Sequence, residues 1–97
     1  MLKEDEVKKI ISEVMHPAIN LSLVELGMVK DIVVEKGRVS MKLMIPFPNI
    51  PILDYLISSL KRPLEQIGAD VDIEVKQMSE EEVQYFLNKE RENWKGM

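Results

Sequence analysis

The sequence predicts a two-layer α/β (α+β) fold whose elements follow in the order α-β-β-α-β-α. Three stretches carry apolar residues at helical spacing, and three others have the apolar or alternating pattern of strands. A hairpin followed by a crossover helix and a third strand indicates a three-stranded sheet with the helices packed mainly on one face. With 97 residues the chain has room for one modest core, so we expect residues 1–97 to form a single domain.

The first predicted element is an amphipathic helix over roughly residues 4–14. Its apolar residues fall at i, i+3, i+4 and i+7, namely Val7, Ile10, Ile11 and Val14. Acidic residues occupy the first turn, where the helix dipole favours negative charge. Pro17 stops the helix, because the residue before a proline avoids the α region. Residues 16–27 show no clean period and are interpreted as a loop that ends at Gly27.

The next two elements form a predicted β-hairpin. The stretch from Val29 to Glu35 is rich in β-branched apolar residues. Lys36 and Gly37 then supply a tight turn, because Gly37 can take a positive φ. From Val39 to Ile45 the apolar side chains sit at every second position, which is typical of a half-buried strand.

A rigid loop, Pro46–Pro51, leads into the second helix, since its three prolines fix φ at three positions. Asn49 is the predicted N-cap residue, and Pro51 fits the first turn, where its missing N–H costs little. The apolar stripe of this helix comprises Leu53, Leu56, Ile57, Leu60, Leu64 and Ile67. Pro63 interrupts the stripe, which predicts that the helix kinks or restarts there, and Gly68 closes the helix.

The third strand, over residues 71–75, has one acidic face. Its acidic side chains are Asp70, Asp72 and Glu74. An edge position or a basic neighbour such as Lys42 would ease their repulsion. Ser79 and Glu82 then form a capping box for the last helix, whose narrow apolar seam comprises Val83, Phe86, Leu87 and Trp94. Residues 88–97 are highly polar and are expected to fray at the end.

Composition narrows the classes of function. Thirteen Lys and Arg against seventeen Asp and Glu give a net charge of −4, so nucleic-acid binding, which favours a basic excess, is not expected. The sequence has no cysteine, so this chain alone offers no disulfide, no thiolate nucleophile and no thiolate ligand for zinc or iron. The N-terminus is charged, and the longest apolar stretch, residues 44–57, is broken by prolines and Asp54. We therefore expect a cytoplasmic protein with no membrane contact.

Three segments carry a family resemblance: Val14–Leu21, Leu23–Ile32 and Met41–Asp54. Together with the order of elements they resemble the SufT/PaaD-like iron–sulfur cluster assembly domain family over roughly residues 4–87. The first segment is similar to the family's Asp-Pro-Glu loop, and the second to its Val-Asp-Leu-Gly-Leu-Val run into the first strand. The third is similar to the family's proline loop, Thr-Thr-Pro-x-Cys-Pro-Leu-x-Asp. The resemblance implies the family's fold and a role with assembly partners in cluster maturation.

The departures from this family pattern fall on its polar groups. His16 stands in place of the loop aspartate and Ala18 in place of the glutamate. Pro46 and Phe47 replace the two threonines, and Ile50 replaces the cysteine. Because isoleucine cannot ligate iron, the resemblance implies that no cluster is carried through position 50.

We therefore expect a non-enzymatic accessory or partner-binding domain that resembles iron–sulfur cluster assembly factors and has lost the cluster-binding thiol. The expected partner is a protein, such as a component of the iron–sulfur assembly machinery, and no cofactor, metal ion or catalytic residue is expected. The candidate partner-binding residues lie in two loops: His16, Pro17, Phe47, Asn49 and Ile50. Phe47 next to Ile50 would form an exposed apolar patch of the kind that partner proteins bind.

Two alternatives stay open. His16, the only histidine, could serve a small metal- or ligand-binding catalytic domain, because imidazole titrates near neutrality. The simpler interpretation places His16 on the surface or against the dipole at the end of the first helix. Separately, the apolar seam of the last helix could pair two copies of the chain as a homodimer.

Overall fold

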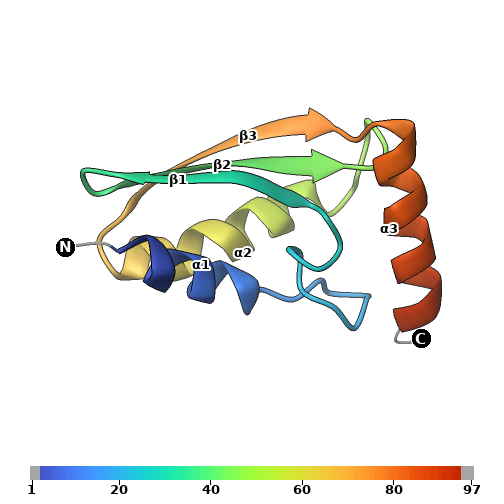
Figure 1. The fold of residues 1–97 in the computed structure, drawn as a ribbon, viewed down its shortest axis with the longest axis horizontal. Coiled ribbons are helices and arrows are strands. Elements are labelled where there is room, and N and C mark those ends of the chain that lie inside the picture. Colours follow the sequence, from blue (N-terminus) through green and yellow to red (C-terminus); the bar gives the residue numbers. More distant parts are fainter. Residues whose placement is uncertain (1–2, 95–97) are drawn as a thin grey trace.

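The structure is a computed structural model that describes residues 3–94. Its elements are α1 Glu4–Ser12, β1 Val29–Glu35, β2 Arg38–Ile45, α2 Leu53–Gln66, β3 Asp70–Gln77 and α3 Glu80–Asn93 (Figure 1). The strands form one sheet in the order β1-β2-β3, in which β1 and β2 are antiparallel and β2 and β3 are parallel. The predicted fold class and order of elements are therefore confirmed.

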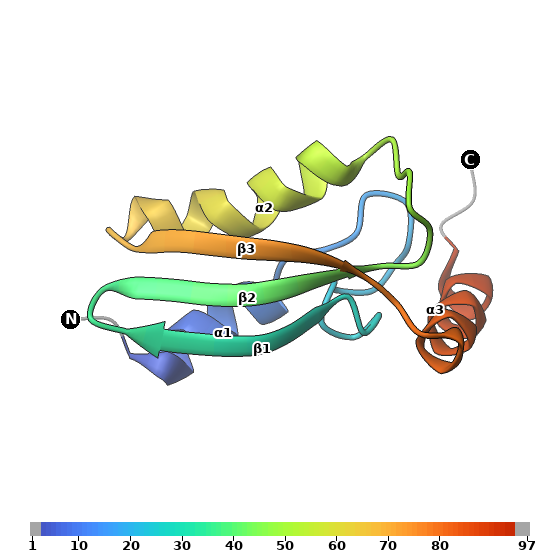
Figure 2. The same cartoon turned by 90° about the horizontal axis from the view of Figure 1, so that it is seen from above.

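The core lies between the sheet and two of the helices. In Figure 1, α1 and α2 both lie below the sheet, and Figure 2 looks onto the opposite face. The side chains they bury beneath the sheet are Val7, Ile11, Leu56, Leu60 and Leu64. Helix α3 stands apart, running crosswise beyond the strand ends (Figures 1 and 2). Among residues 3–94, no helix is both long enough and apolar enough to cross a membrane.

The acidic face of β3 lies on an edge strand, as predicted. Strand β3 pairs with β2 alone in the sheet order, and Lys42 of β2 stands opposite Glu74 in the register. The ammonium group of Lys42 also lies 3.0 Å from a carboxylate oxygen of Asp31. Asp31 sits in a register shift of β1 and takes a φ of 54°, which is uncommon for a residue other than glycine. Basic groups therefore accompany the acidic ones on the face of the sheet that α1 and α2 leave open.

The structure contradicts two predictions about α2, that it restarts at Pro63 and that Asn49 caps it. The helix runs unbroken from Leu53 to Gln66 through Pro63. Leu60 and Leu64, on either side of the proline, are both fully buried, so core packing keeps both halves in one continuous helix despite the missing hydrogen bond. Asn49 is not the N-cap residue, because the loop continues as a turn and the cap falls on Ile52, without a side-chain hydrogen bond.

The ends of the other helices also differ from prediction. Helix α1 ends at Ser12 rather than near residue 14. Helix α3 continues to Asn93, so the polar residues 88–93 are helical, and the fraying expected at the end of this stretch falls partly on residues 95–97, which lie outside the described residues. The end of α3 is tied down, because Asn20 N donates to the carbonyl of Asn93 at 2.8 Å and Ile19 forms a β-bridge with Trp94. A polar sequence does not fray where the backbone of another segment pairs with it.

Candidate functional site

Two loops meet beyond the ends of β2 and β3. The loop after α1 and the proline loop after β2 line a common cavity of about 300 Å³. The first loop contributes His16 and Ala18, and the residues of the proline loop are Pro46, Phe47, Asn49, Ile50, Pro51 and Ile52. Met28 and Leu56 also line the cavity, and a further wall comes from Phe86 and Glu90 of α3 and from Trp94 directly after the helix. The lining is predominantly apolar.

Backbone hydrogen bonds give the first loop its shape. The amide of Leu23 donates to the carbonyl of Val14 at 2.9 Å, and the amide of His16 donates to the carbonyl of Leu21 at 3.1 Å. Residues 16–27 therefore form a compact loop that leads back to the sheet. There, Met44 N donates to the carbonyl of Met28 at 2.7 Å. These bonds bring residue 16 to the same end of the sheet as the proline loop.

His16 is buried, with 7% of its surface exposed, and the prediction of a surface residue or helix-end partner is wrong. Its Nδ1 atom accepts a hydrogen bond from the backbone N–H of Ala18 at 3.0 Å. A ring nitrogen that accepts carries no proton, so this bond requires the neutral ring with the proton on Nε2. An aspartate at a turn makes the same bond to the amide two residues on. The Nδ1 atom of His16 therefore makes a turn hydrogen bond of the kind that an aspartate side chain makes.

The other predicted residues divide between the cavity and the surface. Phe47 lines the cavity while 52% of its surface remains exposed, and Ile50 is half-buried beside it. Asn49 is exposed at the rim. Pro17 is exposed and does not line the cavity. The structure therefore brings together four of the five candidate residues.

A turn missed in the sequence supports the first loop. Ser22 N donates to the carboxylate of Glu25 at 2.9 Å, and Glu25 N donates to Ser22 Oγ at 3.1 Å. Hydrogen bonds from the backbone and side chain of Ser22 lower the pKa of Glu25 below its ordinary value, and the charge of Lys89 adds to this. This is the reciprocal pattern of a capping box, and the spacing Ser22-x-x-Glu25 repeats that of Ser79-x-x-Glu82. The spacing could have revealed the turn from sequence alone.

The part that α3 plays in lining the cavity could not be predicted from sequence spacing. Phe86 and Trp94 were expected on an apolar seam, but nothing in their spacing indicates what the seam faces. Glu90 gave no sign of a role. Only the crosswise position of α3 places these three side chains opposite the loops.

The chemistry of the cavity suits an apolar group better than a metal. Its polar side chains are His16, Asn49 and Glu90, and the Nδ1 of His16 is already occupied by the Ala18 amide. Within residues 3–94 no group of three or more His, Cys, Asp or Glu side chains could hold a metal ion. An iron–sulfur cluster is held by thiolates, and the sequence has none, so these residues do not fit a cluster bound by this chain alone. The alternative of a catalytic metal site at His16 is not favoured.

Comparison with known proteins identifies the fold and the family. The model of a family described as iron–sulfur cluster assembly protein matches residues 4–76, from the start of α1 almost to the end of β3. The chain belongs to this family. The predicted family resemblance is confirmed, and the matched residues include both loops of the cavity but stop before α3.

One curated relative and one solved structure agree with this assignment. The chain is 29% identical over 80 residues to an iron-sulfur cluster carrier protein from Synechocystis sp. (strain ATCC 27184 / PCC 6803 / Kazusa), an alignment that covers 82% of this chain. The same alignment covers 23% of the carrier protein, so the chain spans less than a quarter of that relative. A crystal structure of a domain of unknown function, DUF59, from Bacillus anthracis matches with a TM-score of 0.69 at 17% identity, covering 81% of each chain. That likeness concerns the fold.

Proposed function

We propose that the chain is a non-enzymatic domain of iron–sulfur cluster assembly that binds a protein partner through the cavity between its two loops. Membership of the assembly family supports the process in which it acts. The observation that carries the mode of action is the lining of the cavity, which is apolar where the resemblance implies a thiol and two hydroxyls. Such a surface can recognise a side chain of a partner but offers no ligand set for iron.

The exposed part of the site has the composition of a partner surface. Phe47 is 52% exposed beside the half-buried Ile50, and both are held on a backbone restricted by prolines. A rigid apolar loop loses little conformational freedom on binding, which favours association. We infer that the occupant of the cavity is an apolar side chain of a protein in the same pathway, and that the candidate contact residues are His16, Pro17, Phe47, Asn49 and Ile50.

Affinity capture tests the proposed surface. The tagged chain is incubated with an extract of the cell that encodes it, and captured iron–sulfur carrier and scaffold proteins are quantified by mass spectrometry. Phe47→Asp and Ile50→Asp should abolish their capture, because a charge in an apolar contact must be desolvated without a partner. Val33→Asp is the matched control, since Val33 is 43% exposed on β1 and does not line the cavity. Equal capture by all variants would contradict the proposed surface.

Cluster reconstitution tests the other half of the proposal. The purified chain is incubated anaerobically with ferrous iron and sulfide, desalted, and assayed for bound iron and for the visible absorbance of a cluster. We expect no stoichiometric cluster, because the chain supplies no thiolate. A stable cluster on the isolated chain would show that other ligands suffice and would make the domain a carrier in its own right. A cytoplasmic location and the single-domain organisation of residues 1–97 stay predictions.

A further inference from the structure

Helix α3 is attached to the rest of the molecule by unusually little packing. Among its described residues, Phe86 alone is buried, with Val83 and Leu87 half-buried. By contrast, α2, a helix of the same 14-residue length, buries three leucines in the core. Segments with few buried apolar contacts open at lower free energy than the core. Helix α3 is therefore the element whose release would disturb the core least.

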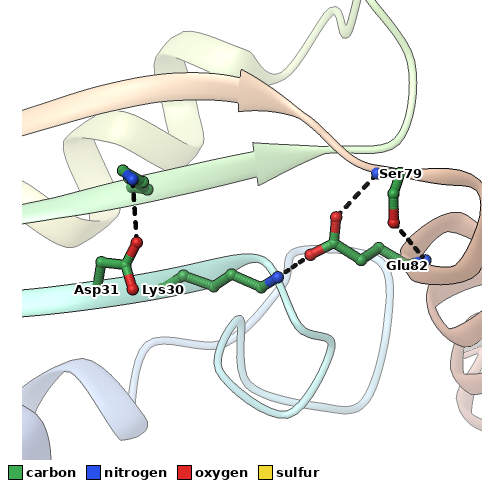
Figure 3. A network of polar contacts seen from close by, with 5 residues as sticks. Lys30, Asp31, Ser79 and Glu82 are labelled. Atoms are coloured by element: carbon green, nitrogen blue, oxygen red, sulfur yellow. Dashed lines mark hydrogen bonds and ion pairs between the residues drawn. The ribbon is translucent and has the colours of Figure 1, made fainter.

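Polar contacts join α3 to the segment Ile19–Lys30 along its whole length. Near its start, Glu82 pairs with Lys30 while also completing the capping box with Ser79 (Figure 3). In its middle, the hydroxyl of Tyr85 donates to the carbonyl of Glu25 at 3.0 Å. The contacts at Lys30 and Tyr85 lie at exposed side chains, where individual hydrogen bonds and ion pairs contribute little to stability.

The aromatic ring of Tyr85 also lies directly against Gly27. A Cβ atom added at Gly27 would come within 3.5 Å of this ring, and the φ of Gly27 is +76°, a conformation that favours glycine. The end of α3 is held by the backbone contacts of Asn93 and Trp94 with residues 19 and 20. Apart from the buried Phe86, the attachment of α3 is thus a row of separate small contacts with the segment Ile19–Lys30.

We propose that α3 is a releasable cover of the cavity, held closed by these contacts and moved aside when the partner binds. The inference rests on the proposed function, because it concerns access to the same site. Phe86, Glu90 and Trp94 form the α3 wall of the cavity, opposite the two loops. Release of α3 would uncover apolar side chains such as Met28 and Leu56, which are now 1% and 0% exposed.

The binding of a partner that recognises only the open form depends on the fraction of molecules in which α3 is released. If the partner binds only after α3 has moved, its apparent affinity is reduced by the fraction of molecules in which α3 is released. Weakening the attachment of α3 should then strengthen partner binding. If α3 were instead a fixed part of the binding surface, the same change would weaken binding or leave it unaltered. The two arrangements therefore differ in the sign of one measurable effect.

The test uses a double variant of the full chain, Lys30→Gln/Tyr85→Phe, which removes the ion pair to Glu82 and the hydrogen bond to Glu25 without altering the capping box. The matched control is Lys36→Gln/Tyr55→Phe, because both of those residues are exposed outside α3 and its contact segment. Amide hydrogen exchange is followed by mass spectrometry for peptides from α3, α2 and β2. Binding of the apolar dye 1-anilinonaphthalene-8-sulfonate reports uncovered apolar surface.

We expect α3 amides of the unaltered chain to exchange at least about tenfold faster than those of β2, and faster again in the double variant, while β2 and α2 stay unchanged. Dye binding should rise in the double variant alone. A protein captured in the experiment above should bind the double variant more tightly, by the factor by which α3 exchange increases. Three results would each contradict the proposal that α3 is a releasable cover. These are exchange of the α3 amides at the same rate as those of the core, dye binding that is unchanged in the double variant, and weaker binding of the partner to that variant. If no partner is captured at all, the proposed function fails, while exchange and dye binding still decide whether α3 opens.

Discussion

The hydrogen bond from Ala18 N to His16 Nδ1 makes a sharp stability prediction. His16→Ala removes a nearly buried ring, worth about 1–2 kcal/mol of transfer free energy, and a hydrogen bond worth about 1 kcal/mol. We therefore expect a loss of about 2–3 kcal/mol in the free energy of unfolding. His16→Asn keeps a side-chain oxygen able to accept from the same amide, so it should be more stable than His16→Ala by about 1 kcal/mol.

Thermal unfolding followed by circular dichroism measures these differences. For a domain of this size 1 kcal/mol corresponds to roughly 4–8 °C in Tm, so the alanine variant should melt roughly 10–20 °C below the unaltered chain. His16→Leu serves as the control, because it keeps apolar volume without an acceptor. If His16→Asn melts no higher than His16→Ala, the hydrogen bond does not hold the loop and the kinship with an Asp-Pro-Glu turn is wrong.

Three further predictions concern other elements. Pro63→Ala should raise the free energy of unfolding in urea by about 1–2 kcal/mol. A proline inside a helix costs about 3 kcal/mol, and its restriction of the unfolded chain offsets part of that cost. A lower free energy of unfolding would mean that α2 needs the proline. Glu25→Gln should flatten the loss of stability as the pH falls below the ordinary pKa of a glutamate. A lowered pKa contributes stability that is present above the ordinary value and is lost as the pH falls through the folded-state value. Equal acid sensitivity would show that the turn does not depend on that charge. Sedimentation equilibrium tests the predicted homodimer, and a monomer at high concentration would remove it.

Much of the fold was accessible from local pattern. Helical spacing around Val7 and Leu60 and alternation around Val39 identify elements because a residue's neighbours at fixed offsets share its face. The parallel pairing of β2 with β3 follows from the helix between them, since a crossover of that length returns the chain in the same direction. The candidate site was accessible in part, as the family resemblance pointed to two loops without showing that they meet.

The failures share a cause. The sequence predicted a kink or restart at Pro63 because proline removes a helical hydrogen bond, and it predicted fraying at the end of residues 88–97 because polar segments lack a core to hold them. Both expectations were drawn from one local segment each, without its contacts to the rest of the molecule. Burial of the leucines flanking Pro63 and pairing of Asn93 with Asn20 supply free energy from elsewhere in the molecule.

By itself, the sequence determined the succession of helices and strands and the absence of any thiolate. These properties depend on residue identity and on spacing along the chain. Only the tertiary structure decided that His16 and Phe47 line one cavity together with side chains of α3, because such contacts join residues whose separation in the chain carries no period to reveal them.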